Sequence, residues 1–121
     1  MLALKRVYER PEPSDGKRIL IDRLWPRGLT KRKAAVDEWM KEIAPSAELR
    51  RWFGHEPAKW PEFARRYRRE LRGQRPLVHR LAKLAAHRRV TLVYGARDEA
   101  HNDARVIASI VRRRMRYAAD S

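Results

Sequence analysis

Residues 90–94 (VTLVY) constrain the fold more than any other segment of the chain. They form an apolar, β-branched run without the polar alternation of a half-exposed strand, a pattern typical of interior strands in parallel sheets. A second short apolar run starts at Ile19, is bounded by turn residues, and predicts a neighbouring interior strand over residues 19–24. Segments with helical periodicity lie between such runs. The sequence therefore predicts an α/β protein, a single layered domain with a small, mostly parallel sheet covered by helices.

Three longer helices are expected to cover this sheet, over residues 57–72, 76–87 and 102–116. In the first, apolar side chains recur at steps of three and four positions, as they do on the buried face of an amphipathic helix. The members of this stripe are Trp60, Phe63, Tyr67 and Leu71. The side chains that we expect to be mostly buried are Trp39, Trp52, Trp60, Phe63, Ile21, Leu92, Ile107 and Ile110.

The first half of the chain predicts shorter elements. A strand is expected over residues 2–8. Thr30 and Ser46 can each cap a short helix, and Gly54 can end the second of these helices. Residues 36–43 fit either a strand or one face of a helix, and we favour the strand.

Length and composition exclude several classes of protein. The 121 residues suit one domain, residues 1–121. The absence of cysteine excludes disulfides, thiolate metal sites and a cysteine nucleophile. The first apolar run is too short for a signal peptide, and no stretch approaches the length of a membrane span. We therefore expect a soluble, cytoplasmic protein with no membrane partner.

The chain is strongly basic, with 30 Lys and Arg residues against 15 acidic residues and a net charge of +15. Such a charge attracts polyanions over long distances, and salt weakens the attraction. Two of the expected helices carry arginine-rich outer faces, with Arg65, Arg66, Arg68, Arg69 and Arg72 on one and Arg112, Arg113, Arg114 and Arg116 on the other. These faces predict one possible function, non-specific binding of nucleic acid. GC-rich codon usage explains the same arginines, and the sequence leaves this choice open.

Ligands of parallel α/β sheets bind beyond the carboxyl ends of the strands, so the loops after the two apolar runs are candidate sites. Arg23 and Arg27 flank Trp25 in the first of these loops. Their planar guanidinium groups can clamp a phosphate or a carboxylate, and Asp22 can orient either one. The alternatives are that Arg23 forms a structural ion pair and that Trp25 packs against the core instead of a ligand.

A second set of candidates lies where the last helix begins. Asp98 and His101 are three residues apart, so on a helical turn they lie side by side and can act as a catalytic acid–base pair. Asn102 can donate an amide hydrogen to a substrate. The alternative is ordinary helix capping by Asp98 or Asn102. His55 and Arg50 can face the same cleft, or His55 can lie on a surface loop. No ligand spacing typical of a metal site is present, and we expect neither a metal nor a cofactor.

Four segments of the chain resemble one protein family. They are IDRLWPRG (21–28), APS (44–46), LRRWFGHEPAKWPEF (49–63) and VYGARDEAHND (93–103). In content and order they resemble the YeaO-like family, domain of unknown function 488, over nearly the whole chain. The resemblance implies a compact bacterial α/β domain and no established substrate. The chain departs from the family pattern at Asp103, where a polar amide is expected, and at Arg97, where lysine is expected.

The sequence thus favours a small-molecule site for an anionic ligand, a phosphate or a carboxylate, with nucleic-acid binding as the alternative. The arginines would hold the anion, and Asp98 and His101 would carry the chemistry of any reaction. The reaction type, the identity of the ligand, the oligomeric state and whether the protein is an enzyme at all are not determined at this level.

Overall fold

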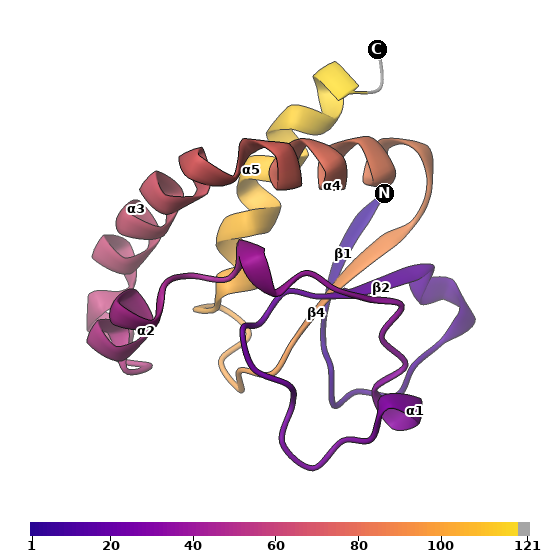
Figure 1. Cartoon of the computed structure of the whole chain (residues 1–121), viewed down its shortest axis with the longest axis horizontal. Coiled ribbons are helices and arrows are strands. Elements are labelled where there is room, and N and C mark those ends of the chain that lie inside the picture. The colour runs from indigo at the N-terminus through magenta and orange to yellow at the C-terminus, as the bar shows by residue number, and fades with distance from the viewer. Residues whose placement is uncertain (119–121) are drawn as a thin grey trace.

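The computed structural model describes residues 1–118, with side chains described through Arg116. Within these residues four strands form one parallel sheet in the order β1-β4-β2-β3 (Figure 1). The strands are β1 (Leu2–Arg6), β2 (Lys17–Leu20), β3 (Glu38–Trp39) and β4 (Val90–Tyr94). The predicted α/β fold with a parallel sheet is confirmed, and β2 and β4 are adjacent interior strands as expected.

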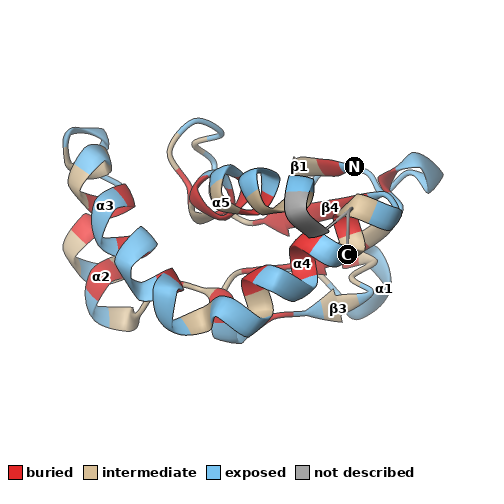
Figure 2. Cartoon of the chain, turned by 90° about the horizontal axis from the view of Figure 1, so that it is seen from above, coloured by how far each residue is buried: buried red, intermediate tan, exposed pale blue. Residues whose placement is uncertain are grey.

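The helices of the described residues are α1 (Lys31–Ala34), α2 (Ala47–Phe53), α3 (Trp60–Leu71), α4 (Arg75–His87) and α5 (Asp103–Ala118). Helix α5 packs against β1 and β4, and α4 packs against α5. Helix α3 was expected on the sheet with them, but it packs mainly against α2 and α5 and lies to one side of the strands (Figures 1 and 2). This sideways position places α2 and α3 next to the carboxyl edge of the sheet. No helix in the described part of the chain is long and apolar enough to cross a membrane.

The predicted caps of the two short helices are confirmed. The Thr30 hydroxyl accepts a hydrogen bond from the Lys33 amide, and the Ser46 hydroxyl accepts one from the Leu49 amide, both at 3.1 Å. Gly54 ends α2 with a φ of 54°, a left-handed conformation that glycine adopts without steric cost.

The strand predicted over residues 19–24 starts earlier, at Lys17, and ends at Leu20, so the prediction was wrong for residues 21–24. The Ile21 amide still donates to a carbonyl oxygen of β4 at 3.3 Å. One residue further along, a side chain takes the place of the main chain in the contact between the two segments. The Asp22 carboxylate accepts a hydrogen bond from the Gly95 amide at 2.7 Å. The chain beyond β2 is thereby released from the sheet as a loop that remains tied to the end of β4.

The strand favoured over residues 36–43 is present only as the two residues of β3, and residues 41–43 form a single 3₁₀ turn. Trp39 was expected to be buried, but it is 37% exposed. It lies on the edge strand, where its indole nitrogen donates to the carbonyl oxygen of Asp22 at 2.7 Å. Trp39 therefore braces the loop after β2 and does not fill the core.

Apart from Trp39, the seven other side chains that were expected to be buried do pack into the hydrophobic core. Phe63, Ile21, Leu92 and Ile107 are buried, and Trp52, Trp60 and Ile110 are partly buried against the core cluster.

The two faces of the sheet carry separate apolar clusters because successive residues of a strand point to opposite sides. Ile19 and Leu92 belong to the main core, which they share with α3, α4 and α5. Leu20 and Val93 belong to a smaller cluster on the other face, covered by α1 and by residues of the loop before it. The loop after β2 is thus anchored on one face while its beginning reaches the carboxyl edge.

Candidate ligand-binding pocket

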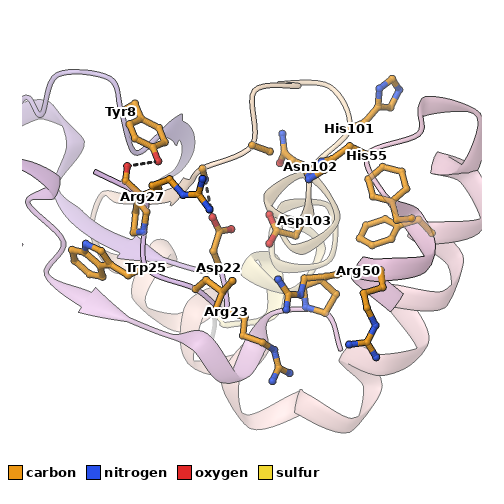
Figure 3. A pocket seen from close by; sticks show the side chains of 18 residues that line it. Tyr8, Asp22, Arg23, Trp25, Arg27, Arg50, His55, His101, Asn102 and Asp103 are labelled. Atoms are coloured by element: carbon orange, nitrogen blue, oxygen red, sulfur yellow. Dashed lines mark hydrogen bonds between the residues drawn. The ribbon is translucent and has the colours of Figure 1, made fainter. Parts of the chain in front are cut away.

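A pocket of about 680 Å³ opens at the carboxyl edge of the sheet (Figure 3). Its walls come from the loop after β2, from α2, from the loop after β4 and from the start of α5. The polar and aromatic residues that line it are Tyr8, Asp22, Arg23, Trp25, Arg27, Arg50, Arg51, Phe53, His55, Phe63, His101, Asn102 and Asp103. The volume lies in the range of sites that hold small molecules. Among the residues proposed from the sequence as site residues, Asp98 does not line the pocket.

Four arginines line this pocket, and we call them the pocket arginines: Arg23, Arg27, Arg50 and Arg51. None of them forms an ion pair with a carboxylate of the described residues, so the structural ion pair considered for Arg23 is not formed there. The Nε atom of Arg50 is buried and has no hydrogen-bond partner within the described chain. The pocket therefore presents more positive charge than its two carboxyl groups can balance.

Asp22 and Asp103 form a carboxyl pair in the same pocket. Figure 3 shows the two carboxyl groups facing each other, and the two side chains are within hydrogen-bonding reach. Burial, together with the charge of Asp22, raises the pKa of Asp103 well above its ordinary value. Burial also raises the pKa of Asp22, against the opposing effects of its hydrogen bonds and of the Arg50 charge. Each carboxyl group opposes the ionisation of the other, so the pair binds a proton more readily than two separate aspartates do, and the effect is stronger at Asp103.

Gly95 allows the Asp22 carboxylate to approach the main chain. A Cβ atom at Gly95 would stand 3.3 Å from Asp22 Oδ2, closer than most Cβ contacts. The Gly95 amide instead donates to that oxygen at 2.7 Å. The carboxylate is therefore held in place by the backbone of the loop after β4.

Asp98 and His101 do meet, but at the rim of the pocket. His101 Nδ1 lies 2.9 Å from Asp98 Oδ2, and this contact holds the pKa of Asp98 below its usual range. Asp98 Oδ1 also accepts the amides of Ala100 and His101 at 2.9 and 3.0 Å. The His101 ring meets Trp60 edge-on at 5.2 Å, and Figure 3 shows it directed away from Asp22. All these contacts of Asp98 are made within the loop before α5, so they stabilise the conformation of that loop.

Asn102 is the N-cap of α5. Its Oδ1 accepts a hydrogen bond from the Arg105 amide at 3.1 Å, and its Nδ2 donates to the Asp98 carbonyl oxygen at 2.9 Å. The residue is only 4% exposed. The amide group is thus committed to the protein, which favours the capping alternative over a contact with a substrate.

The remaining sequence candidates, Trp25 and His55, form parts of the wall. The Trp25 indole donates to the Leu29 carbonyl oxygen at 2.7 Å, and its ring packs edge-on against Trp39 at 5.5 Å. His55 follows α2 with a φ of 58° and is exposed at the pocket. Sequence reasoning did not include Tyr8, whose hydroxyl donates to the Arg27 carbonyl oxygen at 2.9 Å and fixes that part of the loop. Its position in the chain, two residues beyond the carboxyl end of β1, is the signal that could have found it.

Within residues 1–118 no group of three or more His, Asp or Glu side chains is arranged to hold a metal ion. The Asp22–Asp103 pair supplies two carboxyl groups, and the pKa of each is raised. The arrangement of the pocket is instead that of several cationic donors beside a pair of carboxyl groups.

Fold and pocket together define a small parallel α/β protein with an arginine-lined cavity at the carboxyl edge of its sheet. The family model described as "Inactive DUF488-N3 subclade" matches residues 1–121. The chain therefore belongs to the YeaO-like DUF488 family, as the four sequence segments indicated.

Bacterial relatives support this assignment. The chain is 46% identical over 108 residues to "Uncharacterized protein YeaO" of Escherichia coli K12, which covers 89% of this chain and 94% of that protein. It is 43% identical over 106 residues to "Uncharacterized protein Rv3073c" of Mycobacterium tuberculosis H37Rv, covering 88% and 89% respectively. No solved structure matches the chain significantly.

Proposed function

We propose that the pocket binds a small molecule that carries a phosphate or carboxylate group. The observation that supports this most directly is Arg50, whose buried Nε has no hydrogen-bond partner in the described chain. A buried donor left unsatisfied costs about 1–3 kcal/mol, which an anionic ligand would recover if binding turns the Nε of Arg50 toward the cavity. Arg23 and Arg27 add two further guanidinium groups from the loop after β2. Together they can hold an anion from more than one side.

We propose binding without turnover. The matching family model is described as inactive. Asp98, the expected partner of a catalytic histidine, lies outside the lining of the pocket. Asn102 has both amide atoms engaged within the chain. In this proposal Asp98 and His101 shape the rim of the pocket and do not transfer protons to a ligand.

Thermal unfolding in the presence of phosphates, nucleotides and carboxylates tests the proposal. A ligand at a hundred times its Kd raises the free energy of unfolding by about 2.7 kcal/mol. Arg50→Gln and Arg23→Ala should each reduce this stabilisation, whereas Arg10→Ala, which alters an exposed arginine away from the pocket, should leave it intact. The proposal fails if none of these anions stabilises the protein, or if they stabilise Arg50→Gln as much as the parent chain.

The alternative function, non-specific binding of nucleic acid, is supported by a second feature. A groove of about 280 Å³ between the α3–α4 junction and α5 is lined by Arg68, Arg72, Arg75, Arg113 and Arg114, and we call it the arginine groove. None of these five arginines has an ion-pair partner among the described side chains, and no acidic residue lines the groove. By contrast, Arg65 and Arg66, two of the arginines proposed from the sequence, both pair with Glu62 at 2.7 Å.

Titration of duplex and single-stranded oligonucleotides at physiological salt tests this alternative. Phosphate contacts predict a salt dependence with a slope near −0.9 for each phosphate neutralised on duplex DNA. Tight binding that is lost on reversing Arg72 and Arg113 to glutamate, and retained in Arg10→Glu, would support it. Binding that disappears at physiological salt would mean that the groove is only a solvated surface.

A further inference from the structure

We infer that the ligand of the pocket is a polyol phosphate, a molecule with hydroxyl groups beside its anion, and that the Asp22–Asp103 pair binds one of those hydroxyl groups. This inference rests on the anion-binding function proposed above. It adds a second recognition element, in which Asp22 accepts the hydroxyl group and Asp103, which the sequence analysis noted only as a departure from the family pattern, positions Asp22.

The geometry of Asp22 supports the role of a hydrogen-bond acceptor. Its Oδ2 accepts the Gly95 amide at 2.7 Å, and the side chain lines the cavity. An ionised carboxylate has about four lone-pair positions, so contacts with Gly95 and Asp103 leave acceptor capacity for a ligand. The backbone of Gly95 fixes the carboxylate in advance, which lowers the entropic cost of binding.

The balance of charge in the pocket favours a hydroxyl group over an ammonium group as the donor. Even with both carboxyl groups ionised, the pair carries two negative charges against the four positive charges of the pocket arginines. An ammonium group would meet net repulsion from these guanidinium groups. A neutral hydroxyl group can donate to Asp22 without this penalty, and the anion of the same molecule remains free to meet the arginines.

The position and size of the pocket point to one ligand with both groups. Asp22 directly precedes Arg23 in the loop after β2. The positive charge of Arg50 acts to lower the pKa of Asp22, so Arg50 is also close to it. Acceptor and cationic donors thus lie side by side on the same wall. The volume of about 680 Å³ is much larger than a phosphate ion requires and suits a small organic molecule.

Calorimetric titration with ribose 5-phosphate and with methyl phosphate tests the inference, because both are phosphate monoesters and only the first carries a polyol. A hydrogen bond to a charged group contributes about 1.5–3 kcal/mol, so ribose 5-phosphate should bind the parent chain at least about tenfold more tightly. Asp22→Asn should bring this ratio close to one while methyl phosphate binds equally or more tightly. Asp103→Asn should preserve the ratio, since it leaves Asp22 ionised.

Gly95→Ala provides a second variant if Asp22→Asn does not fold. Its new Cβ would press on Asp22 Oδ2 and should also lower the ratio. Equal affinities for the two phosphates in the parent chain, or a ratio that survives both Asp22→Asn and Gly95→Ala, would overturn the inference and leave the anion site standing. If neither phosphate binds the parent chain, the proposed function itself fails together with the inference.

Discussion

The Asp22–Asp103 pair makes the stability of the protein depend on pH in an unusual direction. The pKa of Asp103 is raised above its ordinary value of 3.8 by burial and by the charge of Asp22. Above pH 3.8 the folded chain therefore holds a proton that the unfolded chain releases. The free energy of unfolding should fall as pH rises from there to the raised pKa, by up to about 1.4 kcal/mol per pH unit for one proton. The raised pKa of Asp22 acts with the same sign.

Asp103→Asn removes this proton and keeps the size of the side chain and its ability to donate to Asp22. We expect the curve of unfolding free energy against pH to become flatter, so that the stability of the variant increases relative to that of the parent chain as pH rises from the ordinary pKa of 3.8 toward the raised pKa of Asp103. Urea denaturation at several pH values measures this, provided that the m-value stays constant.

Asp98→Asn is the matched control, because the pKa of Asp98 is lowered by its contact with His101. Its contribution is present above the ordinary pKa and is lost as pH falls, which is the opposite sign, and it is small because the side chain is 40% exposed. Parallel stability curves for Asp103→Asn and the parent chain would show that Asp103 carries no buried proton.

Three further substitutions test the packing and backbone geometry of the fold, each by urea denaturation. Gly16→Ala should cost several kcal/mol, because a Cβ would overlap the Arg89 carbonyl oxygen and φ is +65°, so strain of about 1–3 kcal/mol adds to the clash. Gly28→Ala, with φ of +82° and open space around it, should show the strain alone, and an equal loss at both glycines would refute the clash. Tyr67→Phe should cost about 1–3 kcal/mol, since the buried hydroxyl donates to the Ile43 carbonyl oxygen at 2.6 Å, and a neutral result would mean that this oxygen finds another donor.

Local patterns predicted the elements that local physics determines. The run at residues 90–94 is β4 with unchanged bounds, and Ser46 and Gly54 begin and end α2 as their capping chemistry requires. The end of β2 could not be predicted in the same way. It depends on Asp22 meeting the Gly95 amide, a contact across 73 positions that exists only once the register of β2 and β4 is set. Trp39 was misjudged for a related reason, because its exposure follows from the edge position of β3.

The rule that ligands bind at the carboxyl edge of a parallel sheet was enough to direct attention to the loop of Arg23 and Arg27. Arg50 and His55 also line this cavity, and His55 is at the same time an exposed residue of the loop after α2, so the two alternatives left open for it do not exclude each other. Their roles in binding stay predictions. The carboxyl pair was missed because two neighbouring polar residues, Asn102 and Asp103, both suit the start of a helix. Only the structure shows that Asn102 takes the capping position, which leaves Asp103 as the first helical residue, facing Asp22.

The excess of arginine in this chain divides into groups with different physical consequences. Some arginines are structural, such as Arg18, which is 3% exposed and bonded to Asp15, and Arg80, which pairs with Glu38. The pocket arginines surround a carboxyl pair, so the pocket selects a ligand by the placement of both signs of charge. The arginine groove has no acidic lining residue and attracts polyanions in proportion to their charge, an attraction that salt weakens steeply. Salt dependence therefore separates the two proposed functions without any substitution: affinity at the groove should collapse with added salt, whereas hydrogen bonds to Asp22 and to the buried Nε of Arg50 should retain most of their strength, because buried contacts are screened little.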